Sequence, residues 1–123
     1  MLKKTYYLLI IAITFFSCND KKPSFDFESW QKDECACTNN RAELLDEYNK
    51  LDDYLINKSG KQIIELLGKP DITELNKRHI KTYIYFIDPY REKCPNSNNM
   101  LSRASCIELN SIGKVSVISQ QLR

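Results

Sequence analysis

The spacing of hydrophobic residues changes from a helical to an alternating period at the end of the stretch Ser59-Gly-Lys-Gln-Ile-Ile-Glu-Leu-Leu-Gly-Lys-Pro70. Ser59 and Gln62 match a capping box at the start of a short helix. Gly68 follows the last apolar residue, where glycine accepts the left-handed conformation at low cost, and Pro70 cannot continue a helix. We therefore predict a helix that begins at Ser59 and ends at Gly68.

Upstream, the apolar residues follow a helical period over about residues 41–56. Asn40 is a suitable N-cap, and Glu43 completes a second capping box. The predicted apolar stripe consists of Leu44, Tyr48, Leu51 and Leu55. Trp30 lies before this helix in a stretch without a sustained period, and we expect it to be a buried anchor of the core.

Downstream of Pro70, β-branched and aromatic residues predict strands over about residues 72–75, 80–87, 104–109 and 115–121. Gly113 supplies a positive φ in the turn before the last strand. Helical period thus precedes Pro70 and strand period follows it, which is typical of the α+β class. We predict two N-terminal helices packed on one face of a small, three- to four-stranded antiparallel sheet.

The polar loop over residues 88–99 exceeds the usual length of a hairpin connection. Long loops are commonly functional. Two interpretations remain open at this point: a surface excursion pinned by Cys94, or a loop that binds a partner.

The first residues have the composition of a secretory signal peptide. Lys3 and Lys4 precede an apolar run over residues 6–16, which is too short to span a bilayer as a helix. The junction Ser17-Cys18 resembles the bacterial lipobox, in which the cysteine is acylated after cleavage. We therefore predict a leader over residues 1–17, lipidation of Cys18, a tether over 18–29 and one domain over 30–123. The acyl chains would anchor the protein to the membrane without spanning it.

The leader contains two of the 18 basic residues and none of the 16 acidic ones, so the remaining chain has no formal net charge. Nothing in this balance favours nucleic-acid binding.

Four cysteines follow Cys18, and they allow three complete pairings. A bond between Cys94 and Cys106 would close a loop of roughly a dozen residues and contribute on the order of 3 kcal/mol. We favour that bond. The alternative joins Cys35 or Cys37 to Cys94 or Cys106, in the oxidising compartment that export provides.

The sequence contains little that supports catalysis. His79 is the single histidine, and no glycine pattern presents a nucleophile beside it. Cys35-Ala-Cys37 lacks the spacing of a redox pair, and the cysteines lack the spacing of a zinc site. We therefore expect no enzyme activity, no metal, no cofactor and no small-molecule substrate.

A resemblance to a known family rests on three short motifs between Ser59 and Ile118. They are Leu67, Gly68 and Pro70; Tyr83 and Tyr85; and Gly113, Lys114 and Val115. Their order resembles the BamE/SmpA/OmlA group of small outer-membrane lipoproteins, and the overall composition is similar to uncharacterised lipoproteins of Bacteroidota-like bacteria. The resemblance implies a lipid-anchored envelope protein, at the outer membrane and facing the periplasm, with an accessory role in outer-membrane assembly or integrity.

The expected function is therefore that of a binding or scaffold module with an envelope protein as partner. Candidate contact residues are Tyr83, Tyr85, Tyr90 and Arg91, because interfaces concentrate binding energy in aromatic and arginine side chains. Similar two-layer folds occur in secreted β-lactamase-inhibitor-like domains. The alternative function is consequently an inhibitor-like module that binds a secreted or periplasmic enzyme.

Overall fold

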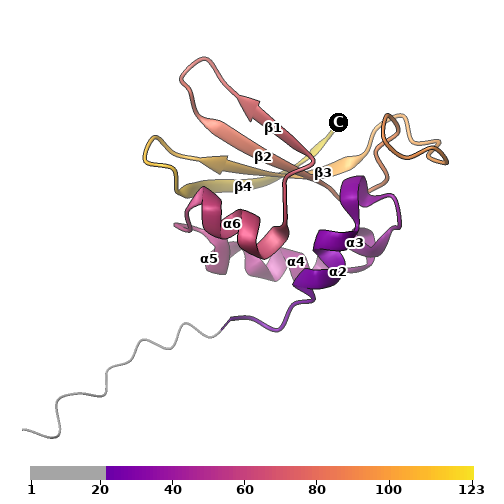
Figure 1. The fold of residues 1–123 in the computed structure, drawn as a ribbon, viewed down its shortest axis with the longest axis horizontal. Coiled ribbons are helices and arrows are strands. Elements are labelled where there is room, and N and C mark those ends of the chain that lie inside the picture. The colour runs from indigo at the N-terminus through magenta and orange to yellow at the C-terminus, as the bar shows by residue number, and fades with distance from the viewer. Residues whose placement is uncertain (1–21) are drawn as a thin grey trace, which may run out of the picture.

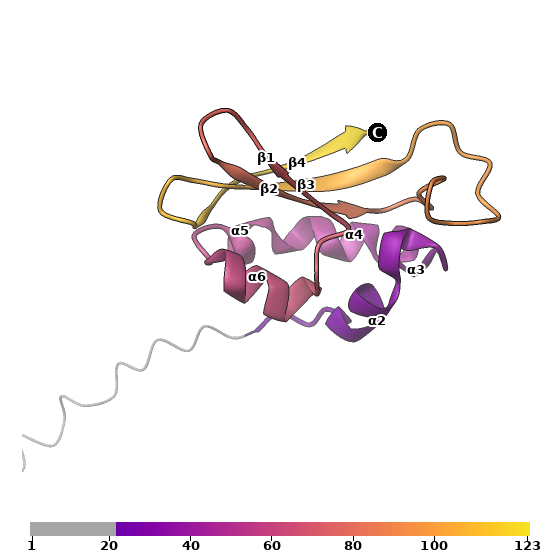
Figure 2. The ribbon, with the colours of Figure 1, turned by 45° about the horizontal axis from the view of Figure 1, so that its top comes forward.

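The computed structural model describes residues 22–123, so the predicted leader and Cys18 lie outside the described residues. Four antiparallel strands form one sheet in the order β1-β2-β3-β4, and the helices lie together on one side of it (Figure 1, Figure 2). The strands are β1 (Ile72–Leu75), β2 (Lys81–Phe86), β3 (Arg103–Leu109) and β4 (Val115–Leu122). This arrangement confirms the predicted α+β class, and each strand begins and ends within one residue of its predicted bounds.

The helical layer is more fragmented than the sequence predicts. The single helix expected over residues 41–56 is wrong, because the chain there forms α3 (Asn40–Glu43), α4 (Leu45–Tyr48), the 3₁₀ turn η3 (Asn49–Leu51) and α5 (Asp52–Leu55). Leu44 and Leu51 have ψ angles of −1° and −10°, which tighten the backbone toward 3₁₀ geometry at both junctions. The apolar stripe nevertheless faces the core, where Tyr48, Leu51 and Leu55 are buried.

The predicted N-cap of this region is also wrong. Asn39 occupies the cap position in place of Asn40, with a φ of 63°, and its side chain makes no capping hydrogen bond. The chain enters α3 from the turn that follows η2 (Glu34–Ala36), so the preceding turn sets the helix start.

The ordered domain begins earlier than the predicted boundary at residue 30. Helix α2 (Phe27–Lys32) starts at Asp26, whose carboxylate accepts a hydrogen bond from the Ser29 amide at 3.1 Å. Phe27 and Trp30 are buried, and the Trp30 ring stacks on Tyr48 with 4.3 Å between ring centroids. The end of the predicted tether is therefore part of the core, while the prediction of Trp30 as a buried anchor is confirmed.

Helix α6 (Gly60–Leu67) forms as predicted. Ser59 and Gln62 make both hydrogen bonds of the capping box. At the other end, Gly68 has a φ of 81° and a ψ of −179°, a conformation open almost only to glycine and distinct from the left-handed helical one predicted. Its carbonyl accepts a hydrogen bond from the Tyr85 hydroxyl at 2.7 Å, which ties the helix end to β2. Pro70 is buried directly after it.

Both faces of the sheet contain packed side chains, because successive residues of β2 point to opposite faces. The face beneath the helices buries Tyr83, Tyr85 and Ile87 with the helical stripe. The opposite face buries Ile84 and Phe86. This smaller cluster also contains Ala36, Ala104 and Cys106, with Ile72 and Tyr90 packed against it.

Candidate partner-binding groove

The structure separates the four predicted contact residues. Tyr85 is fully buried and Tyr83 is 8% exposed, both beneath the helices, so the prediction that they form a partner face is wrong. The cause is the alternation of β2, which turns them toward the same layer as Ile87. Tyr90 lies half-buried beyond β2 and Arg91 beside it is exposed, so these two remain candidates for contact.

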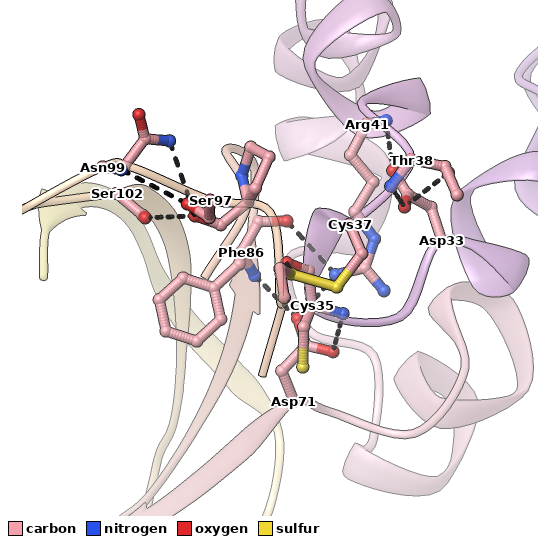
Figure 3. The surroundings of a disulfide bond; sticks show 12 residues. Asp33, Cys35, Cys37, Thr38, Arg41, Asp71, Phe86, Ser97, Asn99 and Ser102 are labelled. Carbon is pink, nitrogen blue, oxygen red and sulfur yellow. Dashed lines mark hydrogen bonds and ion pairs between the residues drawn. A yellow bond between two sulfur atoms is a disulfide. The ribbon is translucent and has the colours of Figure 1, made fainter. Parts of the chain in front are cut away.

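The disulfide bond joins Cys37 to Cys94, with 5.3 Å between their Cα atoms (Figure 3). The favoured pairing of Cys94 with Cys106 is therefore wrong, and the alternative that links the entry segment to the later loop is correct. Cys106 lies in β3, and its side chain packs in the buried cluster around Ile84 and Phe86 on one face of the sheet. Cys35 and Cys106 are free thiols.

A buried ion pair joins the helical layer to the sheet beside this disulfide (Figure 3). Nη1 of Arg41 lies 2.6 Å from Oδ2 of Asp71, and the two side chains are 1% and 3% exposed. Arg41 also donates to the carbonyls of Trp30 and Phe86, and Asp71 accepts from the amides of Cys35 and Phe86. Both charges are thus compensated by hydrogen bonds, as a buried pair requires.

A second buried carboxylate shapes the segment that contains Cys37. Asp33 accepts hydrogen bonds from the amide and hydroxyl of Thr38, at 2.7 and 2.6 Å, and from the amide of Arg41 at 3.0 Å. Cys35 and Ala36 both have positive φ, 55° and 59°, in the tight turn between these anchors. Such backbone conformations persist only where the surroundings fix them. Asp71 binds the amide of Cys35, and Asp33 binds the amides of Thr38 and Arg41, so the backbone is held both in the turn and directly after it.

No motif in the sequence predicts the roles of Arg41, Asp33 and Asp71. One signal was present, since Arg41 precedes Leu44 by three residues and so continues the apolar stripe toward the core. A charge at an inward position predicts a buried partner. Nothing in the local sequence identifies Asp71 as that partner.

The loop over residues 88–102 is fastened at its base as well as by the disulfide. Arg103 donates to both carboxylate oxygens of Asp88, at 2.8 and 2.9 Å, and these hydrogen bonds lower the pKa of Asp88. The Pro89 carbonyl accepts from the hydroxyls of Ser102 and Ser97, at 2.7 and 3.1 Å. The disulfide at Cys94 pins the loop, and the loop is consequently preorganised.

A groove of about 470 Å³ opens between this loop and the end of β4. Its lining includes Tyr90, Arg91, Met100 and Arg123. The Tyr90 ring stacks on Phe86 with 4.1 Å between centroids, and its hydroxyl donates to Glu92 at 2.7 Å. Met100 is 86% exposed at the edge of the groove, and Leu101 next to it is 60% exposed. The groove therefore combines a fixed aromatic ring, an accessible cation and apolar side chains open to solvent.

The two free thiols lack the properties of reactive cysteines. Burial raises the pKa of Cys35, and the negative charge of Asp71 raises it further. Burial also raises the pKa of Cys106. Both thiols are therefore held in the protonated form, which is a poor nucleophile. The two thiols therefore contribute to packing, and neither of them lines the groove.

Two features are absent from the part of the chain that the structure describes. Residues 22–123 contain no group of three or more side chains placed to hold a metal ion. Within the same residues, no helix has the length and apolar character needed to cross a bilayer.

Comparison with known proteins returns no match to any family model, curated protein or solved structure. The resemblance to the BamE/SmpA/OmlA group thus stays a prediction from the motifs.

Proposed function

We propose that this protein is a lipid-anchored binding module of the bacterial cell envelope, which holds a protein partner close to the membrane. The anchor is supported by the basic and apolar leader that ends in Ser17-Cys18. The single observation that carries the binding role is the preorganised loop with the groove around Tyr90 and Arg91. Its exposed Met100 and Leu101 supply apolar surface of the kind that interfaces bury.

Preorganisation explains why this loop is suited to binding. Ordering a flexible loop on association costs free energy, which a loop already fixed by covalent and hydrogen bonds avoids. The disulfide and the pair between Asp88 and Arg103 hold the loop in this way. Arg91 and Tyr90 belong to the residue types that most often dominate binding energy.

The alternative role as an inhibitor-like module uses the same loop. A rigid loop with an exposed apolar residue such as Met100 fits the surface of an enzyme as well as that of an envelope assembly protein. The identity of the bound protein distinguishes the two: a secreted or periplasmic hydrolase supports inhibition, and an outer-membrane assembly protein supports the accessory role.

We expect Cys18→Ala to remove the protein from the membrane, because it deletes the acylated thiol. Cells expressing the wild type or the variant would be treated with a chemical crosslinker, fractionated and probed for the protein and its crosslinked partner. The wild type should be found in the membrane fraction with its partner. The variant should stay unprocessed or become soluble, and its crosslinked product should decrease.

Cys106→Ala is the matched control, because it removes a cysteine that the structure shows as a free thiol. It should fractionate as the wild type does. Membrane partitioning of the Cys18→Ala variant at the wild-type level would contradict the lipid anchor.

A further inference from the structure

The two edges of the sheet differ in length and in charge. The β1 edge has four residues, and its Glu74 forms an ion pair with Arg123. The β4 edge has eight residues, Val-Ser-Val-Ile-Ser-Gln-Gln-Leu, without a charge or a proline. Natural sheets usually protect long edges with charges, prolines or covering segments. Apart from its first residues, β4 has none of these.

The backbone of β4 offers free hydrogen-bonding groups along this edge. Ser102 and Arg123 exchange two backbone hydrogen bonds, at 2.8 and 2.9 Å, so alternation directs the amide and carbonyl groups of residues 118, 120 and 122 away from β3. The segment before α6 covers only the start of the strand, where Val115 bonds to Asn57 and Lys58. Within residues 22–123, the outward backbone groups of residues 118, 120 and 122 have no hydrogen-bond partner.

Acidic side chains outnumber basic ones in the helical segment that contacts the open part of this edge. The Gln120 side chain donates to Asn49 at 2.7 Å, which places η3 beside β4. Asp46 lies in α4, three residues before Asn49, and Asp53 lies in α5, four residues after it. Asp52 is adjacent, and burial together with the charge of Asp53 raises its pKa. None of these three carboxylates forms a salt bridge with another described residue.

We propose that the outer edge of β4 binds an extended, positively charged segment of a partner protein, which adds to the sheet as a fifth strand. Main-chain hydrogen bonds to residues 118, 120 and 122 would supply affinity, as in known strand addition. The carboxylates of Asp46, Asp52 and Asp53, called the acidic row here, would select basic side chains. This inference rests on the proposed binding function, and it specifies how part of the partner is recognised.

A second copy of the chain fits this edge less well than a basic segment does. Antiparallel pairing of two β4 strands would bring the acidic row of one molecule toward that of the other, and like charges oppose association. The end of β4 is also continuous with the groove, since Arg123 lines it and Leu122 is 66% exposed. One partner can therefore contact both surfaces.

The test uses the full chain in non-ionic detergent with two synthetic peptides of about eight residues, the length of β4. One alternates lysine with valine and the other alternates glutamate with valine. Binding would be measured by NMR from the amide signals of Ile118, Gln120 and Leu122 and from their hydrogen exchange. We expect the lysine peptide to bind at least about tenfold more tightly than the glutamate peptide and to slow exchange at these amides.

Gln120→Pro and Gln120→Ala form a matched pair of variants. Both substitutions remove the side-chain hydrogen bond to Asn49. Only proline also removes the backbone N–H of residue 120, which points away from β3, so the hydrogen bonds between β4 and β3 stay intact. We expect Gln120→Pro to weaken lysine-peptide binding about tenfold and Gln120→Ala to change it less than about twofold. A second variant, Asp46→Asn with Asp53→Asn, should reduce the preference for lysine over glutamate.

Equal peptide binding by the proline and alanine variants would overturn the inference. So would absence of binding, or a concentration-dependent dimer that Gln120→Pro abolishes. If the peptide test fails while Cys18→Ala still releases the protein and its partner, the edge inference is wrong and the proposed function stands. Retention of Cys18→Ala at the membrane together with edge-specific peptide binding would refute the anchor and leave the edge site.

Discussion

Replacing Arg41 with methionine is expected to lower the free energy of unfolding by about 3–5 kcal/mol, because it leaves the Asp71 carboxylate buried without its counter-charge. Methionine keeps much of the side-chain volume, so the loss reports on charge more than on a cavity. Equilibrium urea denaturation followed by circular dichroism measures the change. Typical domain stabilities are about 5–15 kcal/mol, so the variant would lose a large fraction of its stability.

Two controls separate the buried pair from charge removal in general. Lys32→Met breaks the exposed pair with Glu28, whose side chains are 72% and 77% exposed, and should leave stability unchanged within error. The double variant Arg41→Met with Asp71→Asn removes both charges, and its single amide oxygen can still accept one of the two backbone hydrogen bonds, from Cys35 or from Phe86. It should lose less stability than Arg41→Met alone. Equal losses for the single and double variants would show that the uncompensated charge of Asp71 is not the cause.

Removing the disulfide by Cys37→Ser with Cys94→Ser is expected to lower the free energy of unfolding by about 4 kcal/mol. The bond joins residues 57 apart, and a crosslink over a chain of that length strongly restricts the unfolded state. The same change should increase hydrogen exchange in the loop over residues 88–102, because the loop loses one of its fixed points. Urea denaturation and exchange mass spectrometry measure the two effects.

Cys106→Ser tests the pairing itself. Peptide mapping without reductant should recover Cys37 linked to Cys94 in both the wild type and this variant, since Cys106 is a free thiol. Recovery of a Cys94–Cys106 peptide from the wild type would contradict the structure and restore the pairing that the sequence favours.

The elements set by local residues could be predicted from the sequence. The capping box of Ser59 and the alternation in β2 each depend on neighbours a few residues away, and both form as expected. The first helix could be predicted only as an apolar stripe. Its breaks at Leu44 and Leu51, where ψ is −1° and −10°, are not encoded by the helical period of the apolar residues.

The candidate site was predictable only in part, because its stability depends on contacts distant in sequence. Cys94 and Cys106 bracket the polar loop, which favours a bond between them, but strand alternation places the Cys106 thiol in the cluster around Ile84 and Phe86. The same alternation places Tyr83 and Tyr85 in the core. The sequence around an aromatic residue in a strand does not indicate which face of the sheet the helices cover. Arg41 and Asp71 are 30 residues apart and meet only in the folded chain.

The buried pair and the disulfide both act on the same part of the molecule. Arg41, Asp71 and Cys37 fix the entry segment, and Cys94 connects that segment to the loop beside the groove (Figure 3). The ion pair and the disulfide both stabilise this part of the molecule. Loss of either one should therefore affect the groove as well as the fold. Groove variants such as Tyr90→Ala therefore need a check of folding before their binding is interpreted.

The claim that this protein binds a partner through the groove is tested most directly by photo-crosslinking in living cells. A photoreactive amino acid would replace Asn99 in the lining of the groove or, as a control, Lys61 on the exposed side of α6. We predict one dominant crosslinked protein from position 99 that is weak or absent from position 61, and that Tyr90→Ala removes without unfolding the chain. Equal crosslinking from both positions, or a product that persists in a folded Tyr90→Ala variant, would contradict the account.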